Sequence, residues 1–194
     1  MNTNVEGSKR GVFGKYRFII ILFSWFYSLF PRSILNSLLT LHRNTPGKIG
    51  YGIRYCIMKN LAISCGENVA IDVGVFFYHP EQMSFGSNVS INPMTYLSGI
   101  GGLIIGSNVS IAHRVTIMTA SHKYEDIQMP IRNQGLIIKQ VQIEDNVWIG
   151  AGVTIVAGKT IGTGSIVGAN SLVTKDIPIN EIWGGVPAKF LRSR

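Results

Sequence analysis

Between Cys65 and Pro178 the chain repeats an apolar residue at nearly every sixth position. This spacing fits neither the 3.6-residue period of a helix nor the two-residue alternation of a strand. Three positions later most repeats carry Gly, Asn or Asp, which tolerate a left-handed backbone and form turns. The repeat therefore predicts one short strand followed by one turn. The apolar positions are Ile71, Phe85, Ile91, Leu97, Ile105, Ile111, Ile117, Ile143, Ile149, Ile155, Ile161, Val167 and Val173.

A unit of six residues cannot bury its own apolar side chain, so successive units must stack into a solenoid with the Ile and Val residues inside. Three units make about one triangular coil, and the coils divide near residues 65, 85, 105, 143 and 161. The sequence thus predicts an all-β fold, a β-helix with an N-terminal helical segment. The expected domains are the helical segment at 1–47, the β-helix at 48–182 and a basic tail at 183–194.

The repeat has one large interruption, the loop 123–142. In a compact domain a loop of this length is usually functional or disordered. Three of the clear repeats lack Gly, Asn or Asp at the turn position, and they carry Met94, Arg114 and Ala120. Two of these belong to the coil that ends at His122, just before the loop. Since an ordinary imidazole, with a pKa of about 6.5, accepts a proton near neutral pH, His122 is the strongest catalytic candidate. An exposed histidine without a function is the alternative.

Positive charge is concentrated at the two ends of the chain, which has a formal net charge of +8. Residues 1–60 hold nine Lys and Arg against one Glu, and residues 183–194 hold three against none. Residues 61–182 hold six against nine acidic residues. A nucleic-acid-binding protein would spread a basic stripe over its folded face, so no nucleic-acid partner is expected. Basic ends suit a membrane surface or a phosphorylated ligand.

The cysteines and histidines predict neither a disulfide framework nor a metal site. Cys56 and Cys65 are the two cysteines of the chain and agree with a reducing compartment, so we expect a cytoplasmic protein. His79, His113 and His122 fall at different positions of the repeat. We therefore do not expect them to converge on one metal ion.

The N-terminal segment contains an uncharged apolar stretch of 13 residues, 18–30. As a helix it would be about 20 Å long, too short for the roughly 30 Å hydrocarbon layer. No small-x-small cleavage site follows, which argues against a secretory signal. Because its polar residues fall near one helical stripe, we expect residues 12–41 to lie on the inner membrane surface. Packing of this helix against the β-helix or a neighbouring subunit is the alternative.

Four segments carry specific motifs: NVWIGA at 146–151, the His122 corner with its loop, VGANSLVTKDIP at 167–178 and GGVPAK at 184–189. In this order they resemble the hexapeptide-repeat acyltransferases. The branch is similar to the sugar O-acetyltransferases, which include maltose and galactoside acetyltransferases and the enzymes that acetylate capsule, exopolysaccharide or lipopolysaccharide sugars. The resemblance covers about residues 48–194 and leaves the N-terminal helix outside.

This resemblance implies a left-handed parallel β-helix, a homotrimer, and acetyl-CoA as co-substrate in a groove between adjacent subunits. The family's histidine before the loop is the base, which falls on His122, and its substrate-orienting Asn corresponds to Asn92. The expected acceptor is a sugar hydroxyl in a cell-envelope polysaccharide or a lipid-linked glycan precursor. The residues expected along the acetyl-CoA groove are Trp148, Ala151, Ala169, Thr174 and Lys175, with Lys189 and Arg192 near its phosphates.

The acceptor remains open at the level of the sequence. The maltose and galactoside enzymes carry an acidic residue about seven positions after the Asn, where this chain reads LSGIGG at 97–102 with an insertion. The acceptor pocket should therefore differ from theirs. Two other functions are acetyl transfer to an amino sugar, amino acid or antibiotic, and a non-catalytic β-solenoid for binding or assembly. The second would need neither a loop at the histidine corner nor a basic tail.

Overall fold

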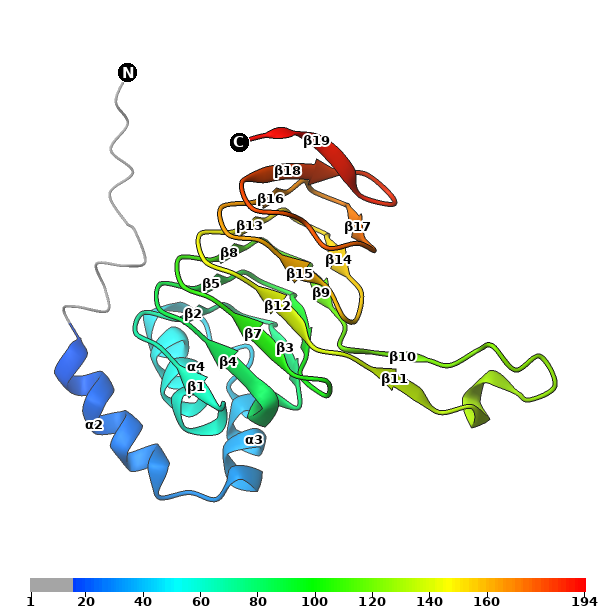
Figure 1. The fold of residues 1–194 in the computed structure, drawn as a ribbon. Coiled ribbons are helices and arrows are strands. Elements are labelled where there is room, and N and C mark those ends of the chain that lie inside the picture. The colour runs from blue at the N-terminus through cyan, green and yellow to red at the C-terminus, as the bar shows by residue number, and fades with distance from the viewer. Residues whose placement is uncertain (1–15) are drawn as a thin grey trace.

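The computed structural model describes residues 16–194, which form a helical segment followed by a three-sided β-helix (Figure 1). The predicted parallel β-helix with an N-terminal helical segment is confirmed. Each side of the prism is a parallel sheet whose strands come from successive coils. Sheet A contains β1 (Ser64–Cys65), β4 (Met83–Phe85), β7 (Leu103–Ile105), β12 (Val141–Ile143) and β15 (Thr160–Ile161).

Sheets B and C form the other two sides of the prism. Sheet B contains β2 (Ala70–Ile71), β5 (Ser90–Ile91), β8 (Ser110–Ile111), β13 (Trp148–Ile149) and β16 (Ile166–Val167), followed by β18 (Glu181–Gly184) and the antiparallel β19 (Lys189–Ser193). Sheet C contains β3 (Phe76–Tyr78), β6 (Tyr96–Ser98), β9 (Thr116–Ile117), β14 (Thr154–Ile155) and β17 (Leu172–Val173). In sheet A the register aligns Cys65, Phe85, Ile105, Ile143 and Ile161, so the coils divide as predicted.

The interior of the prism is made of stacked apolar side chains. All the apolar repeat positions predicted to point inward are buried. A second buried column, two residues earlier in the repeat, was not predicted. It adds to the apolar surface that the coils remove from water, which is the main stabilising term for such a fold. Its members are Val69, Val75, Val89, Val109, Val115, Val147 and Val153.

The corners of the prism depend on residues with a left-handed backbone. We call the corners AB, BC and CA after the sheets that they join. At the AB corner Asn68, Asn88 and Asn108 have φ of 59°, 59° and 60°. Their side chains form a ladder, because the amide of Asn68 donates to Asn88 (2.9 Å) and that of Asn88 to Asn108 (3.2 Å). Asp176 stands three residues after Val173, at a position where the repeat predicts such a turn, but it is not among the residues with positive φ.

The helical segment consists of α2 (Arg17–Ser28), α3 (Arg32–Leu41) and α4 (Gly47–Leu61). The helix α4 lies against the first coil, and its residues Ile57, Met58 and Leu61 are fully buried. It thereby covers the end of the apolar interior, as a terminal cap must in a solenoid. The sequence interpretation started the β-helix domain at residue 48, whereas residues 47–61 form α4 and the first strand begins at Ser64.

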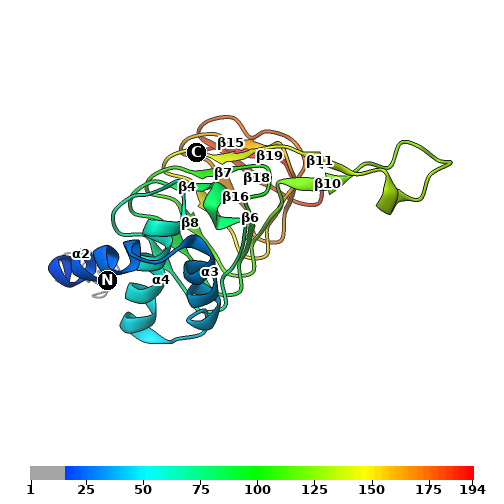
Figure 2. The same ribbon diagram turned by 90° about the horizontal axis from the view of Figure 1, so that it is seen from below.

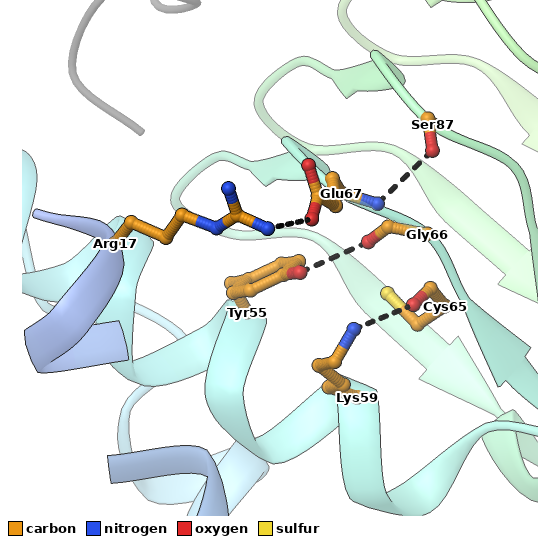
Figure 3. A network of polar contacts seen from close by, with 7 residues as sticks. All are labelled: Arg17, Tyr55, Lys59, Cys65, Gly66, Glu67 and Ser87. Atoms are coloured by element: carbon orange, nitrogen blue, oxygen red, sulfur yellow. Dashed lines mark hydrogen bonds and ion pairs between the residues drawn. The ribbon is translucent and has the colours of Figure 1, made fainter. Parts of the chain in front are cut away.

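Polar contacts fasten these helices to the first coil (Figure 3). From α4, the Tyr55 hydroxyl donates to the carbonyl of Gly66 (2.9 Å), and Lys59 Nζ donates to the carbonyl of Cys65 (3.2 Å). From α2, Arg17 pairs with Glu67 at 3.2 Å, an exposed ion pair of small energetic value.

The most buried of these contacts belongs to Arg54, which is only 1% exposed. Its Nε donates to the carbonyl of Ile71 (3.0 Å) on β2, and its Nη1 donates to the carbonyls of His42 (3.0 Å) and Thr45 (2.7 Å). Burial lowers the pKa of the guanidinium, and the nearby Asp72 carboxylate opposes that shift. One side chain therefore joins α4, the loop after α3 and the first coil.

Replacing Arg54 by Met should destabilise the fold by roughly 2–4 kcal/mol, because the carbonyl groups that it bonds lose their buried donor. Urea denaturation followed by circular dichroism measures the change. Arg32→Met, at an exposed position of α3, is the control and should change stability little. An Arg54→Met protein as stable as the wild type would contradict this role.

Candidate functional site

The predicted loop after His122 is largely an ordered hairpin that projects from the β-helix (Figures 1 and 2). It is formed by β10 (Ala120–His122) and β11 (Leu136–Ile138), with a short 3-10 turn at Ile131–Asn133. The two strands are antiparallel, and His122 lies opposite Leu136. Part of the predicted interruption 123–142 is therefore strand, since β11 and the start of β12 fall inside it. His122 is exposed at the base of the hairpin.

The base of the hairpin is anchored by Thr119, which is fully buried. Its hydroxyl donates to the carbonyl of Ser98 (3.2 Å) and accepts a hydrogen bond from the N–H of Gly101 (2.9 Å). Its carbonyl accepts from the N–H of Lys139 on the returning strand (3.0 Å). Because these contacts join both strands of the hairpin to the neighbouring coil, His122 stands three residues from a fixed point.

The carboxylates of the hairpin do not contact the imidazole. Glu125 accepts from the N–H of Tyr124 (3.1 Å) and Asp126 from the N–H of Gln128 (2.9 Å), so both serve the hairpin's own backbone. Within residues 16–194 the side chain of His122 makes no hydrogen bond or ion pair. Its ring is therefore open to a ligand.

Asn92, Ala151 and Ala169 all lie at the BC corner, in different coils. Asn92 follows β5, and its amide donates to the carbonyl of Ile111 in the next coil (2.8 Å). Ala151 follows β13 and Ala169 follows β16. A Cβ on Gly150 would lie 2.6 Å from the backbone N of Ala169, so the coils approach closely here. This corner presents backbone and methyl groups.

The other predicted residues lie on sheet B or at the CA corner. Trp148 is 53% exposed on β13, and Lys189 and Arg192 are exposed on β19 at the end of the same sheet. Thr174 and Lys175 are exposed directly after β17, at the CA corner that also carries the His122 hairpin. The structure thus divides the predicted site between two corners of one chain.

Sheet C separates the two corners. One side of the prism is a unit of six residues, about 20 Å of nearly extended chain. A hydroxyl must lie within about 3 Å of a group that takes its proton. Asn92 and His122 of one chain are therefore too far apart to contact the same hydroxyl.

The histidines do not form a metal site. His79 Nδ1 lies 2.8 Å from Glu81 Oε1 in the first coil, whereas His113 follows β8 at the BC corner. Among the residues that the structure describes, no group of three or more His, Cys, Asp or Glu side chains could hold a metal ion.

The comparisons with known proteins agree with this fold. The family model "Bacterial transferase hexapeptide (six repeats)" matches residues 140–175. The chain is 34% identical over 140 residues to galactoside O-acetyltransferase of Escherichia coli K12, covering 72% of this chain and 68% of that protein. It is 33% identical over 147 residues to the putative lipopolysaccharide biosynthesis O-acetyl transferase WbbJ of the same strain, covering 71% of this chain and 75% of that protein.

A solved structure extends this similarity to three dimensions. The hexapeptide-repeat acetyltransferase VCA0836 of Vibrio cholerae, complexed with acetyl-CoA, matches with a TM-score of 0.72 and 31% identity, over 84% of this chain and 86% of that chain. The chain belongs to the hexapeptide-repeat acetyltransferases. The predicted family and enzyme class are therefore confirmed.

Thr119→Val should remove the hydroxyl that holds the hairpin and leave the Gly101 N–H without its acceptor. We expect a loss of about 1–3 kcal/mol in unfolding free energy. We also expect a fall in acetyl transfer, because His122 loses its fixed support. Thermal unfolding and a coenzyme A release assay measure the two effects. Thr154→Val, on the outer face of sheet C, is the control. Equal behaviour of the two variants would show that Thr119 does not anchor the site.

Proposed function

We propose that the protein transfers the acetyl group of acetyl-CoA to a hydroxyl of a sugar in a cell-envelope polysaccharide or a lipid-linked glycan precursor. The observation that carries this proposal is the exposed His122 at the anchored base of the hairpin, on a fold whose relatives are sugar acetyltransferases. The relatives named above act, by their names, on galactosides and in lipopolysaccharide biosynthesis. Both acceptors present hydroxyl groups.

In the proposed reaction His122 is the general base. An unprotonated imidazole nitrogen accepts the proton of the sugar hydroxyl while that oxygen forms a bond to the acetyl carbon. The carbon–sulfur bond then breaks, and coenzyme A leaves as the thiol once the proton has been returned to its sulfur. Since both substrates meet in one groove, the reaction needs no acetylated enzyme intermediate.

The residues of the BC corner and sheet B fit the co-substrate. An extended pantetheine chain can lie against the backbone where the side chains end in a methyl group, at Ala151 and Ala169. Trp148 offers an exposed ring beside this path. Lys189 and Arg192 provide positive charge for a diphosphate at the end of the solenoid. Thr174 and Lys175 lie at the CA corner and would reach the coenzyme from a second chain.

The separation of the two corners favours a homotrimer with the sites between subunits. If the CA corner of one chain lies against the BC corner of the next, His122 meets the Asn92 and Ala151 of its neighbour. Three chains around one axis give three such sites. Sedimentation analysis of the full-length protein reports the oligomeric state directly.

His122→Ala should lower turnover by about 10²- to 10⁴-fold, the usual contribution of a general base, with the fold unchanged. Labelled acetyl-CoA with separate hydroxyl and amine acceptors measures the rate and the acceptor class. His79→Asn alters another histidine at the CA corner and should leave turnover unchanged. Near-normal activity of His122→Ala would refute its role, and transfer to amines alone would refute O-acetylation.

The exposed apolar side chains of helix α2 support the proposal of a further partner, the inner surface of the membrane. Its apolar side chains are unusually exposed, with Phe18 at 79%, Ile21 at 58% and Trp25 at 62%. Between α2, α4 and β2 lies a cavity of about 790 Å³ lined by Ile19, Phe23 and other apolar residues, so the helix has apolar residues on two sides. No helix among residues 16–194 is long and apolar enough to cross a membrane. The face that carries Phe18 and Trp25 therefore suits an interfacial position.

Phe18→Asp with Trp25→Asp should weaken the binding of the protein to vesicles of phosphatidylethanolamine and phosphatidylglycerol at least tenfold, since apolar area drives such binding. Vesicle co-sedimentation measures it. Ile127→Asp, in the hairpin and 90% exposed, is the matched control. A wild-type protein that does not sediment with vesicles would refute membrane contact. A double variant that loses its oligomeric state instead would place α2 against a neighbouring subunit.

A further inference from the structure

The BC corner contains two residues whose backbone does not suit their side chain. Its turn positions in successive coils are Gly74, Met94, Arg114, Gly152 and Asn170, and all have positive φ. Met94 has φ 61° and Arg114 has φ 58°. Apart from Asn and Asp, residues that have a Cβ rarely adopt this backbone conformation, because the Cβ crowds the following carbonyl. The corner therefore bears a strain in two adjacent coils that Gly or Asn would relieve.

Met94 has a structural explanation. A Cβ on Gly74 would lie 2.6 Å from the sulfur of Met94, so the thioether covers the glycine of the coil below. The packing of this side chain offsets part of the strain.

Arg114 has no such explanation. Its backbone N–H donates to the carbonyl of Pro93 (3.0 Å), a contact that any residue could make. Its side chain is exposed, and among the described residues its guanidinium has no hydrogen-bond or ion-pair partner. A strained position that keeps a side chain without a structural contact indicates a function for that side chain.

Arg114 lies at the BC corner between the coil of Asn92 and the coil of Ala151. Its N–H bonds to the residue after Asn92, and the carbonyl of the preceding His113 accepts from the N–H of Gly152 (3.0 Å), the residue after Ala151. Adjacent coils are about 4.8 Å apart. Arg114 therefore extends from the coil between the acceptor residue Asn92 and the first pantetheine residue, where acceptor and acetyl group would meet.

The guanidinium is also the only full charge on this part of the corner. The corner residues at 92–94, 112–114, 150–152 and 168–170 include no Asp or Glu, and Arg114 is their only Lys or Arg. Arg presents a planar set of donors that matches a carboxylate or a phosphate with two parallel hydrogen bonds. The proposed phosphate-binding residues, Lys189 and Arg192, lie coils away on β19. The anion nearest Arg114 would thus belong to the acceptor.

We propose that Arg114 binds an acidic group of the acceptor, so that the enzyme acetylates sugars that carry a carboxylate or a phosphate near the reacting hydroxyl. This inference rests on the proposed function and narrows its substrate class. Because the contact holds the acceptor and not the coenzyme, it should affect the KM of acidic acceptors and leave the KM of acetyl-CoA unchanged.

The test uses full-length protein and pairs of acceptors that differ in charge: galactose with galacturonic acid, and glucose with glucuronic acid and glucose 6-phosphate. Coenzyme A release gives kcat/KM for each. The wild type should prefer an acidic member, the uronic acids reporting a carboxylate site and glucose 6-phosphate a phosphate site. Arg114→Asn should lower kcat/KM for that acceptor about 10- to 100-fold through KM and leave the neutral sugars unchanged. Arg114→Lys should keep part of the preference.

A second measurement separates ligand binding from a structural role. Asn tolerates positive φ, so Arg114→Asn should raise or preserve the Tm. Met94→Asn makes the same backbone change one coil below without removing a charge, and it should not alter the ratio of acidic to neutral turnover. A fall in Tm or dissociation of the oligomer in Arg114→Asn would overturn the inference in favour of a structural or intersubunit ion pair.

The remaining outcomes are also distinct. Equal loss for acidic and neutral sugars, or a raised KM for acetyl-CoA, would refute acceptor selection while leaving the acetyltransferase in place. A wild type that acetylates only neutral sugars would do the same. No transfer to any sugar by the wild type would instead refute the proposed function, and the inference with it.

Discussion

The structure depends on the register between coils. Each inward Ile or Val lies on the equivalent residue of the coil before, and parallel hydrogen bonds hold this alignment along all three sides of the prism. The alignment fixes the corners as well, because most corners turn at a residue with a left-handed backbone. Residues far apart in sequence, such as Asn92 and Ala151, therefore share one corner without contacting each other. In a solenoid the position of a site residue is set by its place in the repeat, whereas in a globular domain it is set by how the loops fold together.

The division of the site between two corners follows from the same geometry. A coil side of six residues is longer than any hydrogen bond, so a single chain cannot bring both corners to one small substrate. The single large departure from the repeat, the hairpin, begins at the end of sheet C and holds the histidine at its base. On the proposed function, the neighbouring chain supplies the missing half. Acetyl transfer then requires that the chains assemble.

Much of this fold could be predicted from the sequence, because the period of a short repeat can be read directly from the spacing of its apolar residues. The inward Ile and Val residues, the division into coils and the Asn turns at 68, 88 and 108 all follow from local rules and agree with the structure. The helix α4 could not be predicted in this way. Its glycines weaken helix propensity, yet Gly50 is required, since a Cβ there would lie 1.8 Å from the carbonyl oxygen of Thr45. Tertiary contact outweighs propensity at that position.

For the candidate site, the exceptions to the repeat could be recognised in the sequence, but their structural roles could not be inferred from it. Met94 and Arg114 stood out because they occupy turn positions where most repeats have Gly, Asn or Asp. The sequence could not show that both still adopt positive φ. Thr119 is similar, because nothing in the local sequence distinguishes a buried threonine whose hydroxyl and carbonyl together bond three backbone groups. Roles that depend on a second chain lie beyond any local pattern.

The hairpin is a projecting arm that is held at its base by Thr119. The contacts of Thr119 fix the base of this arm, whereas the segment with the short 3-10 turn Ile131–Asn133 lies farther out. His122 stands at the base. Substitutions, insertions or contacts at the tip can therefore change what the arm touches while the imidazole stays in place. The arm can diversify during evolution without disturbing the chemistry at its root.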